Sequence, residues 1–116
     1  MTASLLELRD ALRRFAAERD WDQFHSPRNL ATALAVEAAE LLEPFQWLGE
    51  ATGRELPRAT RAAVVEEMAD VLLYLVRLAD KLEVDLIEAA RTKMARNAAK
   101  YPVEKARGSS RKYDEL

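Results

Sequence analysis

The feature that most restricts the fold of this chain is a pair of segments that are apolar on nearly every side. Residues 30–42 read Leu-Ala-Thr-Ala-Leu-Ala-Val-Glu-Ala-Ala-Glu-Leu-Leu, and residues 71–76 read Val-Leu-Leu-Tyr-Leu-Val. Leu and Ala favour helices, and the chain has only 3 Gly and 4 Pro. Helices that are apolar all round are buried on more than one side, so these segments predict a helical protein that assembles with copies of itself. A monomeric bundle with an Ala-rich surface is the alternative.

Helix signals around these segments predict an all-α fold with no strands. The expected helices cover residues 4–19, 28–48, 58–81 and 85–100. Ser26 and Pro27 suit the N-cap and first turn of the second helix, and Pro44 should kink or shorten its end. We therefore expect a four-helix bundle protomer. It would form one domain over residues 1–106, followed by a polar, basic tail over residues 107–116 that is either mobile or docked on a partner.

Composition excludes several functional classes. The chain has 116 residues, a formal net charge of -2 and no Cys, so it has neither a disulfide framework nor a thiolate nucleophile. A charge so near zero does not favour nucleic acid polymers or anionic membranes. No apolar run approaches the roughly 20 residues that span a bilayer, and the first turns carry charged residues unlike a signal peptide. We expect a cytoplasmic protein that meets any polyanionic ligand locally.

Four acidic residues lie inside or beside the apolar segments. Glu37 and Glu40 are three residues apart, as are Glu67 and Asp70, so each pair shares one helix face. The same spacing recurs elsewhere in the chain, and the apolar surroundings distinguish these two pairs. An ionised carboxylate in such surroundings is costly unless it is paired or binds a metal. Because few cations lie on these faces, the pattern predicts a divalent metal site.

The ligand type indicates which metal. Carboxylate oxygens favour Mg²⁺, with Mn²⁺ also possible, whereas zinc usually takes His or Cys. The sole histidine, His25, lies outside the two pairs. Di-iron bundles use Glu-x-x-His, which neither pair contains. The alternative is that the acids form a solvated face or ion pairs with the fourth helix.

The fourth predicted helix carries polar residues that could meet a phosphate. Lys93, Asn97 and Lys100 fall on one face, with Arg96 beside them. A basic helix end that complements the helix dipole explains the pattern equally well.

Taken together, these residues resemble the MazG-like all-α nucleotide pyrophosphohydrolases, and within them the dCTP pyrophosphatase branch. The resemblance is carried by residues 15–30, 37–47, 66–76, 93–97, 101–102 and 109–113, in one order over nearly the whole chain. It implies hydrolysis of a nucleoside triphosphate, dNTP + H₂O to dNMP + pyrophosphate, with a preference for dCTP or modified dCTP, as in sanitising the nucleotide pool. It also implies a homotetramer built as a dimer of dimers.

The resemblance further implies roles for individual residues. Metal would be held by Glu37, Glu40, Glu67 and Asp70, phosphate by Lys93 and Asn97, and the base by Trp21, His25, Trp47 and Tyr74, partly from a neighbouring chain. An aromatic slot can stack on a pyrimidine and a histidine can hydrogen-bond its edge, although packing alone also explains a Trp or Tyr. Two departures from the family pattern bear on how phosphate is bound and on base preference. Ala98 and Ala99 replace basic residues of animal members, and the loop over residues 49–57 looks short.

The expected reaction is attack of a metal-bound water on the α-phosphorus, with pyrophosphate as the leaving group. Glu40 is the candidate to accept the proton of the water, and Lys93 would stabilise charge on the phosphate. Two alternatives stay open. One is a pyrophosphohydrolase for dUTP or other non-standard nucleotides, and the other is a non-catalytic helical scaffold whose acids pair with Arg and Lys of a partner chain.

Overall fold

The computed structural model describes residues 3–49 and 56–116, and every regular element within these ranges is helical. The elements are α1 (Ala3–Glu18), the 3₁₀ turn η1 (Asp22–Phe24), α2 (Pro27–Leu42), η2 (Glu43–Phe45), α3 (Arg58–Lys81), α4 (Leu86–Lys100), α5 (Val103–Ala106) and η3 (Tyr113–Glu115). The predicted all-α class is confirmed. Most of the predicted loop over residues 49–57 lies outside the described residues.

Helix ends follow the local chemistry of the sequence. The Ser26 side chain accepts a hydrogen bond of 3.1 Å from the backbone N–H of Asn29, which caps the start of α2. The prediction that this helix extends to Leu48 is wrong, because α2 ends at Leu42 and passes into η2. Pro44 lacks a backbone N–H and sits in that turn, so the α-helical hydrogen bonding cannot continue past it.

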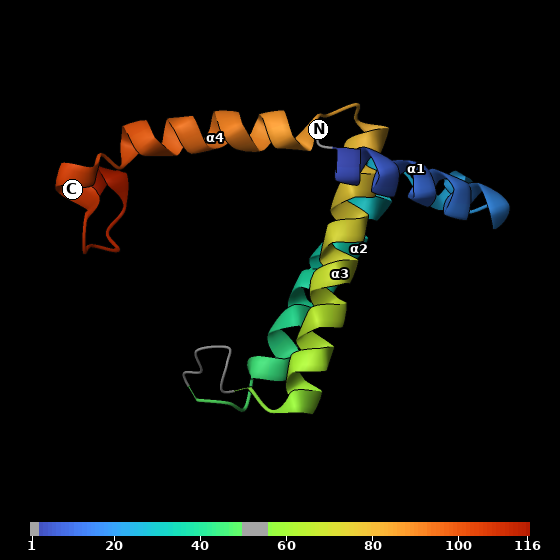
Figure 1. Ribbon diagram of the computed structural model, residues 1–116, viewed down its shortest axis with the longest axis horizontal. Helices are drawn as coiled ribbons and strands as arrows, with labels where there is room; N and C mark the ends of the chain where they lie inside the picture. The colour runs from blue at the N-terminus through green and yellow to red at the C-terminus, as the bar shows by residue number, and fades with distance from the viewer. Residues whose placement is uncertain (1–2, 50–55) are drawn as a thin grey trace. The chain divides into compact units, whose positions relative to one another are not determined.

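The part of the chain that the structure describes divides into two compact units, one over residues 3–49 and 56–84 and the other over residues 85–116. In the first unit α2 and α3 run antiparallel, side by side, and α1 packs against α3 (Figure 1). The buried hydrophobic residues described here are Ala16, Leu30, Val64, Val76 and Ala79. Arg13 of α1 donates to Asp80 of α3 through Nε at 2.7 Å, which ties these two helices together.

The second unit consists of α4, α5 and the C-terminal segment. The Tyr113 ring meets the Tyr101 ring edge-on, with centroids 6.2 Å apart, and Lys100 Nζ lies 4.9 Å from the Tyr113 centroid. These contacts hold the C-terminal segment against the end of α4. Among the described residues, no helix combines the length and hydropathy needed to cross a membrane.

Candidate metal centre and adjoining pocket

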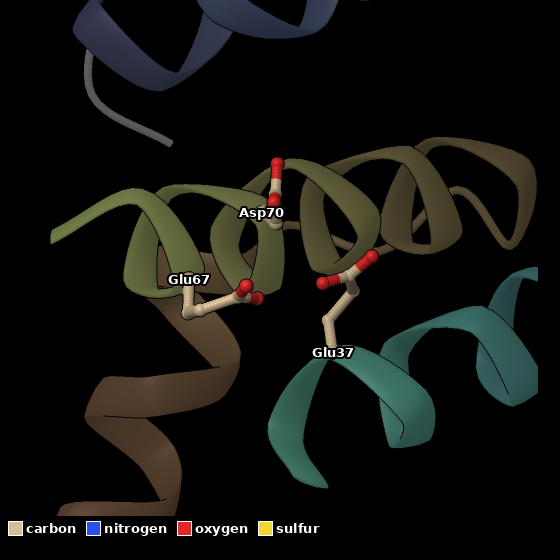
Figure 2. A group of neighbouring side chains, drawn as sticks. All are labelled: Glu37, Glu67 and Asp70. Atoms are coloured by element: carbon tan, nitrogen blue, oxygen red, sulfur yellow. The ribbon is translucent and has the colours of Figure 1, made fainter. Parts of the chain in front are cut away.

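Three of the four predicted metal ligands come together between α2 and α3. One carboxylate oxygen from each of Glu37, Glu67 and Asp70 lies within 4.8 Å of the other two. Figure 2 shows Glu37 on α2 and Glu67 on α3 extending toward one another across the helix pair. The antiparallel packing brings Glu37 opposite α3, and the spacing of three residues places Glu67 and Asp70 on consecutive turns.

The electrostatics of this group call for a cation. Oε2 of Glu37 and Oε2 of Glu67 are buried without a hydrogen-bond partner, and such orphaned polar atoms are costly. Hydrogen bonding with the Glu67 and Glu40 carboxyl groups, followed by burial, raises the pKa of Glu37 to about 7. None of the ion pairs within residues 3–49 and 56–116 involves Glu37, Glu67 or Asp70. An all-carboxylate donor set without basic partners fits a hard divalent cation such as Mg²⁺.

Glu40 borders this group without belonging to it. It lies one turn after Glu37 on α2, and its carboxyl is the second contributor to the raised pKa of Glu37. It is therefore close to the cluster, and its role as a fourth ligand or proton acceptor stays a prediction.

A pocket of about 260 Å³ adjoins the carboxylates. Three of the four residues predicted to hold a base, Trp21, His25 and Tyr74, line it together. Asp70 belongs both to this pocket and to the carboxylate group, so the two features are contiguous. Ligand pockets for drug-sized molecules begin at roughly 300 Å³, so this one suits a part of a ligand such as a single nucleobase.

Trp47, Lys93 and Asn97 are not among the residues that form the carboxylate group or line the pocket. Trp47 follows η2 and is 88% exposed, and it does not line the pocket. Lys93 and Asn97 are exposed on α4, in the other compact unit, and their phosphate-binding role stays a prediction. Within residues 3–49 and 56–84, the candidate site consists of the carboxylates and the pocket.

Arg77 is a pocket residue that is absent from the predicted site. It is buried, at 6% exposure, and lines the pocket beside His25. Its Nε donates to His25 Nδ1 at 3.1 Å, and its Nη2 donates to Asp22 Oδ1 at 2.5 Å. The only signal for it in the sequence is a single Arg directly after the apolar run at residues 71–76.

Comparisons with known proteins agree with this arrangement. Residues 32–116 match the model of the MazG-like family. The chain is 50% identical over 115 residues to dCTP pyrophosphatase 1 of Homo sapiens and 49% identical to the protein of that name from Mus musculus. Each match covers 97% of this chain and 68% of the relative. A solved pyrophosphatase structure from Archaeoglobus fulgidus is similar with a TM-score of 0.79 and 43% identity, covering 88% of this chain and 95% of that one.

Proposed function

Since this chain belongs to the MazG-like family, we propose that it is a nucleoside triphosphate pyrophosphohydrolase that converts dCTP to dCMP and pyrophosphate. The observation that carries the proposal is the position of Asp70, which belongs to both the carboxylate group and the pocket. A cation site directly beside a base-sized pocket suits a ligand that joins a polyphosphate to a nucleobase. The curated relatives named dCTP pyrophosphatase 1, at 49–50% identity, support dCTP as the substrate.

Glu37, Glu67 and Asp70 would hold Mg²⁺, with Glu40 beside them. A bound Mg²⁺ supplies charge neutralisation on the phosphate oxygens and lowers the pKa of water. The chain's own contribution is the geometry, because two helices hold three carboxylates ready for a cation and so spare the cost of gathering them. Of these residues, Glu40 is the group that we propose accepts a proton, since it lies outside the set of three.

The pocket would bind the cytosine ring. Trp21 and Tyr74 offer aromatic surface on which a base can stack, and His25 offers a polar group for its edge. Leu12, Phe15 and Ala16 of α1 add apolar lining to the same pocket. Modified cytosines that keep the same hydrogen-bonding edge would also fit, which supports a role in sanitising the nucleotide pool.

We further propose that the active form is a homotetramer in which α4 supplies Lys93 and Asn97 to the phosphates. The support is the apolar surface that the single chain leaves uncovered on α2 and α3, where Val36, Met68 and Leu72 are 51%, 56% and 41% exposed. Trp47, at 88% exposure, suits a place against a neighbouring chain. The absence of Cys suits a reducing compartment, so we assign the protein to the cytoplasm.

The test is pyrophosphate release with Mg²⁺ across dNTPs, NTPs, dUTP and 5-modified dCTPs. We expect dCTP or a modified dCTP to give the highest kcat/KM. Asp70→Asn should lower kcat at least a hundredfold, whereas Glu7→Gln, an exposed acid on α1, should not change it. Highest turnover of dUTP would favour the alternative substrate, and no pyrophosphate from any nucleotide would favour the scaffold. Full activity of Asp70→Asn would refute the site.

A further inference from the structure

The Arg77 guanidinium engages three different groups with three different nitrogens. Nε donates to His25 Nδ1 at 3.1 Å, Nη2 donates to Asp22 Oδ1 at 2.5 Å, and Nη1 lies 3.5 Å from Asp80 Oδ2. The Arg77 side chain is only 7% exposed. Asp22 and Asp80 therefore fix the plane of a buried guanidinium, and that plane fixes the direction of Nε–H toward the imidazole.

This contact determines where the imidazole carries its proton. A guanidinium is always protonated and is only a donor, so the nitrogen that faces Nε must accept. A neutral imidazole has one donor and one acceptor nitrogen. With Nδ1 of His25 accepting from Arg77, the proton must be on Nε2.

The remaining ring nitrogen is left for a ligand. His25 lines the pocket with Trp21 and Tyr74, and its Nε2 makes no hydrogen bond to any residue in the described part of the chain. Burial, and then the charges of Arg77 and Lys81, lower the pKa of His25, so its neutral form prevails at pH 7. The pocket thus contains a histidine that donates through Nε2 and cannot accept there.

We propose that Arg77 is a positioning residue that holds His25 in the Nε2–H tautomer and thereby selects bases that present an acceptor to the pocket. The inference rests on the proposed function, because it names how the same pocket tells one pyrimidine from another. Cytosine has an unprotonated N3, which can accept from Nε2–H. Uracil carries a hydrogen on N3, which would face a second donor there. The arrangement favours cytosine over uracil when N3 of the base faces Nε2, since O2 is an acceptor in both bases.

The tautomer can be measured directly because His25 is the only histidine. In protein labelled with ¹⁵N-histidine and ¹⁵N-arginine, long-range ¹H–¹⁵N spectra at neutral pH should show a protonated Nε2 and an unprotonated Nδ1. A scalar coupling across the hydrogen bond should join Arg77 Nε to His25 Nδ1. A protonated Nδ1, or no such coupling in the wild-type protein, overturns the proposal, and this result needs neither a variant nor an active enzyme.

The substrate arm compares kcat/KM for dCTP and for dUTP in variants. Arg77→Lys keeps a positive charge near Asp22 and Asp80 but loses the planar donor, and we expect the dCTP to dUTP ratio to fall about tenfold, the effect of one hydrogen bond. Arg14→Lys, the same change at an exposed position of α1, should leave the ratio unchanged. If Arg77 had a purely structural role, Arg77→Lys would lower kcat/KM for dCTP and for dUTP by the same factor. An unchanged ratio of the two values in Arg77→Lys would therefore overturn the proposal.

Replacing His25 provides a matched pair. The amide nitrogen of Gln reaches about the position of imidazole Nε2, and that of Asn about the position of Nδ1. We expect His25→Gln to keep the preference for dCTP and His25→Asn to lose it, and the reverse order would contradict the donor assignment. If the wild-type protein releases no pyrophosphate from dCTP, the proposed function fails, while the tautomer and the coupling to Arg77 remain measurable separately.

Discussion

Replacing Glu67 by Gln should change the stability of the protein in opposite directions without and with Mg²⁺. The carboxylate oxygens of Glu67 and Asp70 lie within 4.8 Å of one another. Two unit charges at that distance repel by about 3.5 kcal/mol at an effective dielectric constant of about 20. Because both side chains are only half-buried, solvent reduces this to about 1 kcal/mol. Without metal, the variant should therefore melt about 4 °C above the wild type for a domain of this size.

Excess Mg²⁺ should reverse that order. A cation that binds only the folded state adds RT ln(1 + [L]/Kd) to stability, which is about 2.7 kcal/mol when [L] is a hundred times Kd. The wild type gains this stabilisation in full. The variant has one ligand fewer among Glu37, Glu67 and Asp70, so it gains little and should now melt below the wild type.

Thermal unfolding followed by circular dichroism, at fixed protein concentration and with EDTA or 10 mM Mg²⁺ present, measures the difference in melting temperature between the variant and the wild type under both conditions. Glu66→Gln is the matched control, because Glu66 is the exposed neighbour on α3 and should respond to neither condition. A scaffold whose acids are paired with Arg or Lys makes the opposite prediction. If Glu67→Gln lowers the melting temperature in EDTA and Mg²⁺ shifts neither protein, the metal-site reasoning is refuted.

Three further predictions concern the pocket, the helix packing and the assembly. Trp21→Ala should raise KM for dCTP at least tenfold with a smaller change in kcat, because Trp21 lines the pocket and is not among the carboxylates. Steady-state kinetics measure both constants, and a fall in kcat with an unchanged KM would contradict a role in binding the base. Hydrogen bonding from Arg13 lowers the pKa of Asp80, so the pair stabilises the fold above the unfolded pKa near 4 and loses this effect as the pH falls through the lower folded value. Urea unfolding of Asp80→Asn should therefore depend less on pH below about 4 than that of the wild type. Leu72→Glu should reduce the mass measured by light scattering, because Leu72 is 41% exposed on α3, and an unchanged mass would place the interface elsewhere.

Local sequence signals sufficed for most of the helices. Ser26 and Pro27 mark the start of α2 because a side-chain acceptor and a fixed φ act within one turn. The end of α2 was predicted too late, because the aromatic run after Pro44 keeps the apolar pattern going although the backbone cannot stay α-helical. Similarly, the meeting of Glu37 with Glu67 and Asp70 could be expected from the sequence. Carboxylates on apolar helices that pack together are costly when isolated, and a shared cation removes that cost.

The Arg77 network could not be predicted, and the reason is its range. Arg77 and His25 are 52 positions apart, and Arg77 and Asp22 are 55 apart. Their contact depends on how η1 lies against α3, which no helical period encodes. An Arg after an apolar run is equally compatible with a solvated helix end. Only the packed structure distinguishes a buried guanidinium with three partners from an exposed one.

The carboxylate group and the apolar surface of α2 and α3 should be coupled through the same helix pair. When Glu37 is ionised, it repels the acids of α3 across the helix pair and so weakens the packing of α2 on α3. That packing rests on few buried groups, because the described buried hydrophobic residues number only five, two of them Ala. A cation between the carboxylates and a second copy over Val36 and Leu72 would both favour the same close packing of α2 on α3. By linkage, each should then strengthen the other.

Mg²⁺ should accordingly tighten self-association, and dilution should weaken the apparent affinity for Mg²⁺ by the same factor. Sedimentation velocity with EDTA and with Mg²⁺, over a range of protein concentrations, measures the first effect. Metal titration at two protein concentrations measures the second. Glu67→Gln should lose the Mg²⁺ dependence and associate in EDTA at least as well as the wild type. Association constants that are equal in EDTA and Mg²⁺ for the wild-type protein would show that the metal site and the interface act independently.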